Sequence, residues 1–326
     1  MTIRVAVIGA GRRGTAHTEA VADLEGVAQV VGVADTDEVR ARKLVGTSAP
    51  HGTAYTDAAT MLRETAPQIV YVTTPPPLHL EQTLAAFAVG ANVVLEKPIA
   101  LSNEEADQIG EAAEKSGRLV HICHQMRYNE STPQLRRLLS RQTVALTHIW
   151  NYRKGPDIPG NWNRGWGGGH VVEWGIHYLD LCRYVMQTEA VEVYARYADQ
   201  VLRGQPTWDN WDSYSVTVQW ANGAVGSYAS TYALKPGLTS DAGMVIIAAD
   251  GKATCEWNGA TWDTPESKAS WPGAQGAGER ALARAFAAAT NGDTSQIRQT
   301  YGDALKTHRL VMAANQSAEE GRPIRL

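Results

Sequence analysis

Three short stretches of the sequence hold side chains whose types and spacing could do chemistry, and the first is the acid–base pair before Pro98. Glu96 and Lys97 directly follow the apolar run Val93–Leu95. Proline disfavours the helical conformation in the residue before it, so Lys97 is held extended at the end of a strand. Open α/β sheets bind their ligands at the carboxyl ends of strands. A lysine there could hydrogen-bond a substrate oxygen and stabilise negative charge that develops on it.

A second group of ionisable residues follows a triple glycine in the middle of the chain. Residues 171–186 have the periodicity of a helix. Glu173, His177 and Asp180 fall four and three residues apart, which places them on one face of that helix. An imidazole titrates near neutral pH and can act as a general base, which an acid one turn away can orient. His170, Glu173 and His177 could alternatively bind a divalent metal, but we favour the acid–base role and predict no metal site.

The third stretch is a glycine-rich loop close to the N-terminus. It has the pattern G-x-G-x-x-G and lies between an apolar run and a segment of helical composition. In that context Gly9 permits a tight turn, Gly11 lets backbone amides approach a pyrophosphate, and Gly14 allows close packing of helix on strand. The helix N-terminus then favours the phosphate charge. The predicted dinucleotide-binding residues of this loop are Gly9, Gly11, Arg12, Arg13 and Gly14.

Asp35 is the residue predicted to decide between NAD and NADP as the cofactor. It ends the apolar run 29–34, about 20 residues past the glycines, where an acid hydrogen-bonds the adenosine ribose of NAD. A carboxylate there would repel the 2′-phosphate of NADP, so we predict NAD as the preferred cofactor. Arg40 and Arg42 nearby leave NADP open, and Asp35 could alternatively serve only as a turn residue.

The first third of the chain alternates between apolar runs and segments of helical periodicity. Runs rich in β-branched residues, as expected of strands buried on both faces, occur at 3–8, 29–34, 68–73, 93–95 and 119–124. Helical patterns occur at 15–24, 56–63, 80–89 and 103–116. This alternation predicts an α/β domain with a doubly wound parallel sheet, over residues 1–121.

Residues 122–326 have a different pattern, which predicts an α+β domain with a large, mainly antiparallel sheet. Strand patterns occur at 144–151, 190–197, 212–220, 224–232, 244–249 and 252–257, with turn residues between several neighbours. Helical patterns occur at 133–140, 171–186, 281–290 and 301–320, and the polar segment 261–278 is predicted to be a loop.

These motifs, in this order, resemble the Gfo/Idh/MocA oxidoreductases. The matching residues of the first domain are the N-terminal glycines, Asp35, Thr74-Pro75-Pro76 with His79, and Glu96-Lys97-Pro98. The second domain also resembles the family in its glycines, followed by an acid, a histidine four residues later and an aspartate three residues after that. The chain departs from the family in having Glu173 where aspartate is usual.

The resemblance implies an NAD(P)-dependent enzyme that transfers hydride between the nicotinamide and a secondary alcohol or ketone of a sugar, glycoside or inositol derivative. Lys97, His177 and Glu173 would be its catalytic residues. The expected cofactor-binding residues beyond the glycine loop and Asp35 are Thr74, Pro75, His79, Glu96, Lys97 and Gln125. The expected substrate-binding residues are Arg127, Tyr128, Trp162, Trp166, Glu173 and His177. Arg127 could instead form a surface ion pair, and Glu96 could instead be only the partner of a nearby cation.

The resemblance also implies an assembly. In the family the last helix packs back toward the first domain and the outer face of the second sheet forms the subunit contact, so we expect a homodimer or homotetramer. Two other functions stay open. The protein could retain NAD and use transient oxidation as an epimerase, lyase or glycosidase, or it could be a non-catalytic dinucleotide-binding regulator. Retention of Lys97 and His177 argues against a regulator.

The segment 154–169 is a long loop rich in glycine, proline, asparagine and tryptophan. A loop of this length in a compact domain is commonly functional or disordered, and Trp162 and Trp166 argue against disorder. We predict a lid or wall over the nicotinamide and the sugar. A subunit contact is the alternative.

Composition excludes several classes of protein. The net charge of −4, without basic runs, argues against a nucleic-acid partner. The sequence has no signal-peptide pattern and no apolar stretch of the ~20 residues that cross a bilayer, so we expect no membrane partner. Cys123, Cys182 and Cys255 are few and far apart, which favours free thiols in a reducing compartment. We therefore expect a cytoplasmic protein.

Overall fold

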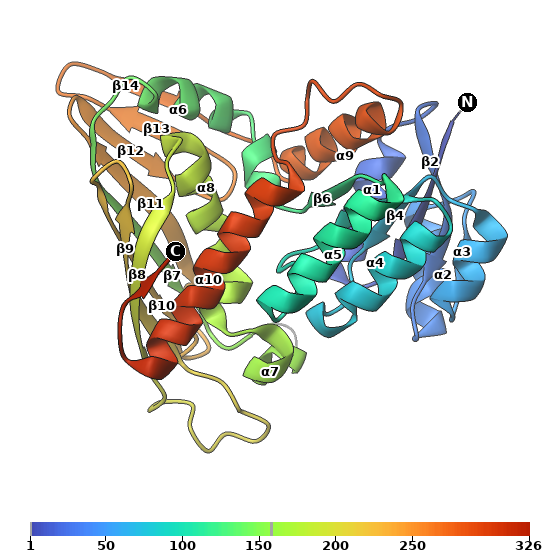
Figure 1. Cartoon of the computed structure of the whole chain (residues 1–326), viewed down its shortest axis with the longest axis horizontal. Helices are drawn as coiled ribbons and strands as arrows, with labels where there is room; N and C mark the ends of the chain where they lie inside the picture. The colour runs from blue at the N-terminus through green and yellow to red at the C-terminus, as the bar shows by residue number, and fades with distance from the viewer. Residues whose placement is uncertain (1, 157–158) are drawn as a thin grey trace. The chain divides into compact units, whose positions relative to one another are not determined.

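A computed structural model describes residues 2–156 and 159–326 (Figure 1). The chain divides into two compact units, each made of two segments. The first unit holds the residues up to Tyr128 together with Gly276–Leu305, and the second holds Asn129–Gln275 with Lys306–Leu326. This division differs from the predicted ranges 1–121 and 122–326, because residues 276–305 return to pack with the first unit.

The first unit is built on a six-stranded parallel sheet with the order β3-β2-β1-β4-β5-β6. Its strands are β1 (Ile3–Ile8), β2 (Ala28–Ala34), β3 (Thr53–Tyr55), β4 (Ile69–Val72), β5 (Asn92–Leu95) and β6 (Val120–Ile122). Its helices are α1 (Arg12–Ala22), α2 (Glu38–Ser48), α3 (Ala58–Thr65), α4 (His79–Ala88), α5 (Asn103–Ser116) and α9 (Ala277–Thr290), with short 3₁₀ turns η1 (Pro76–Leu78) and η2 (Gln125–Tyr128). The predicted doubly wound parallel sheet is confirmed.

Alternate residues of the central strands explain why helices cover both faces of this sheet. In β1, Val5 and Val7 belong to a core shared with α1, α2 and α9. Ala6 and Ile8 belong to a second core, shared with α3, α4 and α5. Both sets are almost fully buried, which is why β1 reads as a continuous apolar run rather than an alternating one.

The sequence analysis missed or misplaced parts of the first unit. No elements were predicted at α2 and β3, which follow Asp35 and complete the edge of the sheet. Helix α1 begins at Arg12, three residues before the predicted start, directly after Gly11. The earlier start places Arg13 and His17 one turn apart on the same helix.

The second unit contains a nine-stranded sheet with the order β14-β13-β12-β11-β7-β10-β9-β8-β15. The neighbours β7 and β10 are parallel and the other pairs are antiparallel, so the predicted mainly antiparallel sheet is confirmed. The strands are β7 (Val144–Tyr152), β8 (Ala190–Ala198), β9 (Ser213–Trp220), β10 (Val225–Thr231), β11 (Asp241–Ala248), β12 (Gly251–Cys255), β13 (Ala260–Asp263), β14 (Lys268–Trp271) and β15 (Ile324–Arg325).

Helices cover one face of this sheet (Figure 1). They are α6 (Ser131–Leu139), α8 (Ile176–Met186) and the part of α10 (Tyr301–Glu320) that starts at Lys306, while the short elements η3 (Pro159–Trp162) and α7 (Arg164–Gly167) lie in the connection after β7. The first residues of α10 pack in the first unit, where the Tyr301 hydroxyl donates to the Ala106 carbonyl. The prediction of a loop at 261–278 was wrong, because β13 and β14 form there as a pair of short antiparallel strands in which polar and apolar residues alternate.

The two faces of the second sheet differ in exposure. Along β9, alternate residues from Tyr214 to Trp220 are buried while those between them face outward. On three paired strands, Leu146, Val225 and Ile247 are 40%, 50% and 37% exposed. These neighbours form an apolar area on the sheet. No helix in the described part of the chain is long and apolar enough to cross a membrane.

Candidate active site

The carboxyl ends of the parallel strands bring the predicted residues of the first unit to one edge of its sheet. Gly9 follows β1, Asp35 follows β2, Thr74 lies beyond β4 and Lys97 lies beyond β5. Parallel strands end at the same edge, which is where such sheets bind ligands.

The glycine loop has the shape that a dinucleotide requires. Gly9 has a φ of +98°, a conformation that favours glycine. A Cβ on Gly14 would lie 1.8 Å from the Gly9 carbonyl oxygen, so any side chain there would push α1 off the loop. A Cβ on Gly11 would meet no atom within 4 Å, which leaves open space beside the first turn of α1. The loop therefore fits a bound pyrophosphate at the helix N-terminus.

Asp35 is held against the glycine loop by both carboxylate oxygens. Oδ2 accepts the Ala10 N–H at 2.8 Å and Oδ1 accepts the Asp37 N–H at 2.9 Å. The Arg40 Nη2 atom lies 3.6 Å from Oδ1. Asp35 therefore stabilises a turn while it lies at the end of β2, where an acid would bind the ribose. The two predicted roles of this carboxylate are compatible.

The predicted Thr74–His79 segment divides into exposed and buried parts. Thr74 and Pro75 are half-exposed beyond β4. His79 is fully buried, with Nδ1 2.9 Å from the Pro98 carbonyl and Nε2 2.9 Å from the Thr74 carbonyl. Burial lowers the pKa of His79 despite these carbonyls. The ring ties the loop after β4 to the backbone after Lys97, so any contribution to a cofactor site is through the position of those loops.

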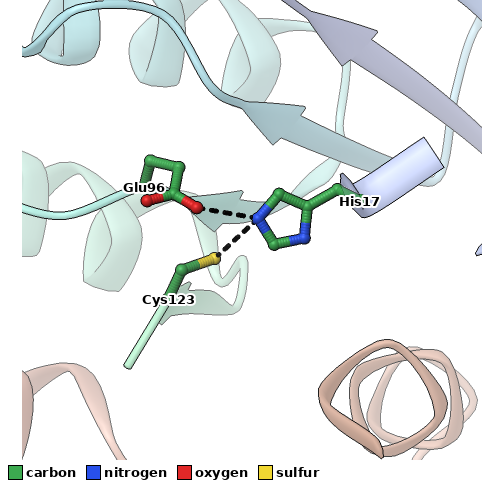
Figure 2. A group of neighbouring side chains, drawn as sticks. All are labelled: His17, Glu96 and Cys123. Carbon is green, nitrogen blue, oxygen red and sulfur yellow. Dashed lines mark hydrogen bonds and ion pairs between the residues drawn. The ribbon is translucent and has the colours of Figure 1, made fainter. Parts of the chain in front are cut away.

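Lys97 is half-exposed, whereas Glu96 beside it is buried in a cluster of polar side chains. Glu96 Oε1 accepts from Arg13 Nε at 2.6 Å and from His17 Nε2 at 2.8 Å. The Cys123 Sγ atom lies 3.6 Å from the same Nε2, and Figure 2 shows the carboxylate and the thiol both facing this nitrogen. Arg13 Nη1 also lies 3.1 Å from Glu279 Oε1. The Arg13 guanidinium thus binds two carboxylates of its own unit, and its contact with a dinucleotide stays a prediction. Arg12 is exposed at the start of α1.

The charges of this cluster stabilise one another. Burial alone would raise the pKa of Glu96, but the Arg13 guanidinium, then His17 and Lys97, hold it well below its usual range. Burial would likewise lower the pKa of Arg13, and Glu96 and Glu279 keep it above the ordinary value. Burial, together with the Glu96 charge, raises the pKa of the Cys123 thiol well above normal. Glu96 is therefore an anion and Cys123 a neutral thiol at neutral pH.

Three predicted residues lie in η2, after β6. Gln125 is buried, and its Oε1 has no hydrogen-bond partner among the described residues. Arg127 is 1% exposed, with an ion pair to Asp303 and a hydrogen bond to the Arg298 carbonyl. The Tyr128 hydroxyl accepts the Arg298 N–H at 3.0 Å. Arg127 thus forms the ion pair that was the alternative to substrate binding, but in the interior rather than at the surface.

In the second unit, Glu173 and His177 lie on a helix whose first turn is widened. Residues Val171–Gly175 form a π-helical turn that continues into α8. This turn changes the angle between successive side chains, and such turns occur frequently at functional sites. The Glu173 carboxylate accepts a short hydrogen bond from the Tyr232 hydroxyl. Asp180 instead accepts from Thr307 Oγ1 at 2.8 Å, so it packs α8 against α10.

The alternative metal set of His170, Glu173 and His177 is not brought together. Among the described residues, the group of histidine, cysteine and carboxylate side chains close enough to share an ion is His17, Glu96 and Cys123. His170 Nδ1 lies 2.6 Å from the Tyr228 hydroxyl, and burial, then the Arg153 charge, hold the pKa of His170 well below its usual value. Its ring packs edge-on against Tyr232, the hydrogen-bond partner of Glu173.

Aromatic rings surround His177, and the sequence analysis did not identify them. Trp257 packs edge-on at 5.0 Å between ring centroids, and Trp174 lies at 6.2 Å. The Arg153 guanidinium stacks on the Trp174 ring at 3.5 Å. Trp257 follows β12, 80 residues after His177 in the chain, so no local pattern could have linked the two. Tyr232, the partner of Glu173, is distant in sequence in the same way.

The predicted lid segment 154–169 contains residues 157–158, which lie outside the described residues. The Trp162 Nε1–H donates to the Pro156 carbonyl at 3.2 Å, and its ring packs edge-on against Trp208. Trp166 is 40% exposed. It lines an open hollow of about 730 Å³ in the second unit, together with Gly160, Asn163, Gly165, Thr207, Trp208 and Asp209. A role over the nicotinamide stays a prediction.

Two family models match the chain, one in each of its two units. Residues 3–124 match the oxidoreductase family with an NAD-binding Rossmann fold, and residues 142–254 match the GFO/IDH/MocA C-terminal domain. The chain belongs to the Gfo/Idh/MocA oxidoreductase family. Its first unit is accordingly an NAD(P)-binding Rossmann domain, and the resemblance stated from the motifs is confirmed.

Two curated relatives are similar to this chain over part of its length. The D-glucoside 3-dehydrogenase of Escherichia coli K12 is 27% identical over 256 residues, which cover 71% of each chain. The inositol 2-dehydrogenase of Paracoccus denitrificans is 27% identical over 192 residues, which cover 59% of this chain and 56% of that protein. The alignment with the inositol dehydrogenase thus spans little more than half of its length.

Solved structures share the fold over the full chain. GenD2 from gentamicin A biosynthesis, in complex with NAD, has a TM-score of 0.83 at 22% identity and covers 100% of this chain and 96% of its own. Levoglucosan dehydrogenase, in complex with NADH, has a TM-score of 0.84 at 18% identity and covers 100% of this chain and 99% of its own. At these identities the likeness concerns the fold.

Proposed function

We propose that this Gfo/Idh/MocA protein is a dehydrogenase that uses NAD to oxidise a secondary alcohol of a sugar, glycoside or inositol derivative, or reduces the corresponding ketone. The observation that carries the proposal is that the chain has both Lys97, next to the buried Glu96, and His177, on the same helix as the buried Glu173. The names of the curated relatives, which act on glucosides and inositols, support the substrate class.

The roles of the residues follow from their chemistry. A bound nicotinamide supplies the hydride acceptor or donor. His177 takes the hydroxyl proton as a general base, because an imidazole can exchange protons near neutral pH. The Lys97 ammonium hydrogen-bonds the same oxygen and stabilises the negative charge that develops there. Glu173, fixed at one oxygen by Tyr232, orients His177 or binds a neighbouring hydroxyl.

His177 is tested by substitution with glutamine, which keeps a hydrogen-bonding side chain but cannot act as a base. We expect kcat to fall by about 10²- to 10⁴-fold, as for loss of a general base. The assay is NADH formation from NAD⁺ across a panel that includes myo-inositol and methyl β-glucopyranoside. His148→Gln, in a half-buried histidine of β7 bonded to Ser227, is the control and should keep kcat. Unchanged turnover in His177→Gln would refute this assignment.

The same assay separates the alternative chemistry. Suppose that a sugar is consumed without net formation of NADH, and that the enzyme-bound NAD⁺ is unchanged at the end. This result would favour an epimerase, lyase or glycosidase that uses transient oxidation over a dehydrogenase. Binding of NAD⁺ without conversion of any member of the panel would favour a regulator.

The preference for NAD is tested at Asp35. In Asp35→Ser the repulsion of a 2′-phosphate is removed, and Arg40, which lies 3.6 Å from that carboxylate and is also paired with Asp37, is close enough to bind the phosphate. We expect the ratio of kcat/KM for NADP⁺ to that for NAD⁺ to rise by at least about tenfold, the effect of 1.4 kcal/mol. Asp57→Ser, at the N-cap of α3, is the matched control, because its carboxylate accepts the Thr60 N–H, and it should leave the ratio unchanged.

We also propose that the apolar area around Leu146, Val225 and Ile247 is the contact between copies of the chain. These side chains are exposed on three neighbouring strands, and exposed apolar areas of this kind commonly mark protein contacts.

A further inference from the structure

The cluster around Glu96 links the dinucleotide loop to Lys97. Arg13 and His17 lie one turn apart on α1, which begins at the glycine loop, and both contact Glu96 Oε1. The other oxygen, Oε2, accepts the backbone N–H of Lys97 at 3.3 Å. One carboxylate therefore connects the helix at the phosphate site with the backbone of the lysine.

His17 is placed to hold this carboxylate in one orientation. It is 0% exposed, and its ring packs against Tyr71 at 5.1 Å between centroids. Its Nδ1 has no hydrogen-bond partner among the described residues, whereas Nε2 lies 2.8 Å from Glu96. A proton on Nε2 suits the 2.8 Å contact with the Glu96 carboxylate, which is shorter than the 3.3 Å contact of Nε2 with Arg13 Nη2, so we assign His17 as a donor to Glu96.

A metal ion is the other occupant that the group His17, Glu96 and Cys123 could hold. The Arg13 guanidinium already supplies positive charge at 2.6 Å from Glu96 Oε1, and its Nη2 lies 3.3 Å from His17 Nε2. A metal would have to displace this cation and also deprotonate Cys123, although burial and the Glu96 charge oppose a thiolate there. The observed contacts favour an ion-pair network.

We propose that His17 and Arg13 are positioning residues for Lys97 and act through Glu96. The inference rests on the proposed catalytic role of Lys97. Glu96 fixes the backbone at which the catalytic side chain begins, and α1 fixes Glu96 relative to the cofactor loop. Loss of this link would misplace the Lys97 ammonium without removing it, and a misplacement of about 1 Å can cost about 10²-fold in rate.

The test compares His17→Leu, which removes the donor, with His17→Gln, whose amide nitrogen can still donate to Glu96. With myo-inositol or methyl β-glucopyranoside as substrate, we expect kcat to fall by about 10- to 100-fold in His17→Leu and to return to within about threefold in His17→Gln. The dissociation constant for NAD⁺ should stay within about twofold of the wild type in both, because kcat rather than binding depends on the lysine. Thr18→Val, equally buried on α1 and bonded only to the Gly14 carbonyl in the described structure, is the control and should keep kcat.

Two further measurements separate positioning from general structural damage. In a Lys97→Ala background, His17→Leu should lower the residual kcat no further, because residues that act through one group are not additive. Labelling of Lys97 by trinitrobenzenesulfonate, followed by peptide mass spectrometry, needs no substrate. Its rate should rise severalfold in His17→Leu, relative to the exposed Lys115, and return in His17→Gln.

Three results would overturn the inference. The first is an unchanged kcat together with unchanged Lys97 labelling in folded His17→Leu. The second is that His17→Leu lowers kcat by the same factor in the wild type and in Lys97→Ala. The third is a stoichiometric metal in the purified wild type that is absent from His17→Leu. Failure of the proposed function has a different outcome. In that case Lys97→Ala keeps turnover, while the labelling experiment still reports whether His17 holds Lys97.

Discussion

Lys97→Ala should lower kcat by about 10²- to 10⁴-fold, the range for loss of a group that stabilises charge or transfers a proton in the transition state. The side chain lies half-exposed beyond β5, at the edge of the sheet that also carries the glycine loop. Arg13 is not free to take its place, because it is bound to Glu96 and Glu279. The substitution should therefore slow the chemical step, and kcat should fall for that reason.

The measurement is steady-state formation of NADH, together with the dissociation constant for NAD⁺ from fluorescence titration. We expect NAD⁺ to bind Lys97→Ala within about twofold of the wild type, since an interaction made only in the transition state changes kcat without changing binding. Lys115→Ala, an exposed lysine at the end of α5, is the control for loss of a positive charge. Turnover close to that of the wild type would rule out Lys97 as a catalytic residue.

The fold of the first unit was largely predictable, because burial and close packing of its elements leave recognisable local patterns in the sequence. Strands such as β1 and β4 are buried on both faces, which leaves a continuous apolar run in the sequence. Gly14 could be read in advance because a side chain there would collide with Gly9. The apolar strands and the glycine loop are local patterns that each have one physical explanation. Because the strands are parallel, the residues at their carboxyl ends lie at one edge of the sheet.

Contacts between distant residues were not predictable in this way. That Arg13 and His17 share a helix face can be derived from their spacing, but the spacing does not show that this face meets Glu96, 79 residues beyond His17. Glu96 was therefore predicted either to contact the cofactor or to pair with a nearby cation, and its partners Arg13 and His17 were not identified. Trp257 beside His177 and Tyr232 beside Glu173 are further cases, because strand pairing in the second sheet decides both neighbours.

The widened turn at Val171–Gly175 shows a different limit. Glu173 and His177 have the i, i+4 spacing of an ordinary helix, and the sequence alone places them and Asp180 on one face. The π-helical turn instead lets Glu173 reach Tyr232 of the sheet while Asp180 meets Thr307 of α10. This gives a physical account of glutamate where the family has aspartate, because Tyr232 holds the end of the longer side chain.

Glu96→Gln should destabilise the first unit by about 3–5 kcal/mol at neutral pH, the usual effect of removing one partner from a buried ion pair. The substitution keeps the shape of the side chain but removes the charge that offsets Arg13. The Glu96 side chain is 5% exposed, and that of Arg13 is 21% exposed, so solvent can compensate the remaining guanidinium only in part. We expect a lower urea midpoint for the unfolding of this unit.

Glu38→Gln is a matched control. Glu38 and Arg42 form an ion pair at the same N–O distance of 2.6 Å, but their side chains are 56% and 72% exposed. An exposed pair contributes only about 0–1 kcal/mol, because water and salt screen the charges. Equal losses of stability in Glu96→Gln and Glu38→Gln would contradict the assignment of Glu96 as a buried, paired anion.

The pH dependence of this destabilisation identifies its origin. The pKa of Glu96 in the folded protein lies well below the ordinary value of 4.5, so its ionised form stabilises the fold fully above that value. As pH falls below 4.5 toward the folded pKa, the wild type loses this contribution and the variant has none to lose. The difference in unfolding free energy between wild type and Glu96→Gln should therefore be constant from about pH 6 to 8 and shrink in acid. A difference that persists unchanged below pH 4.5 would point to altered packing rather than to the lost charge.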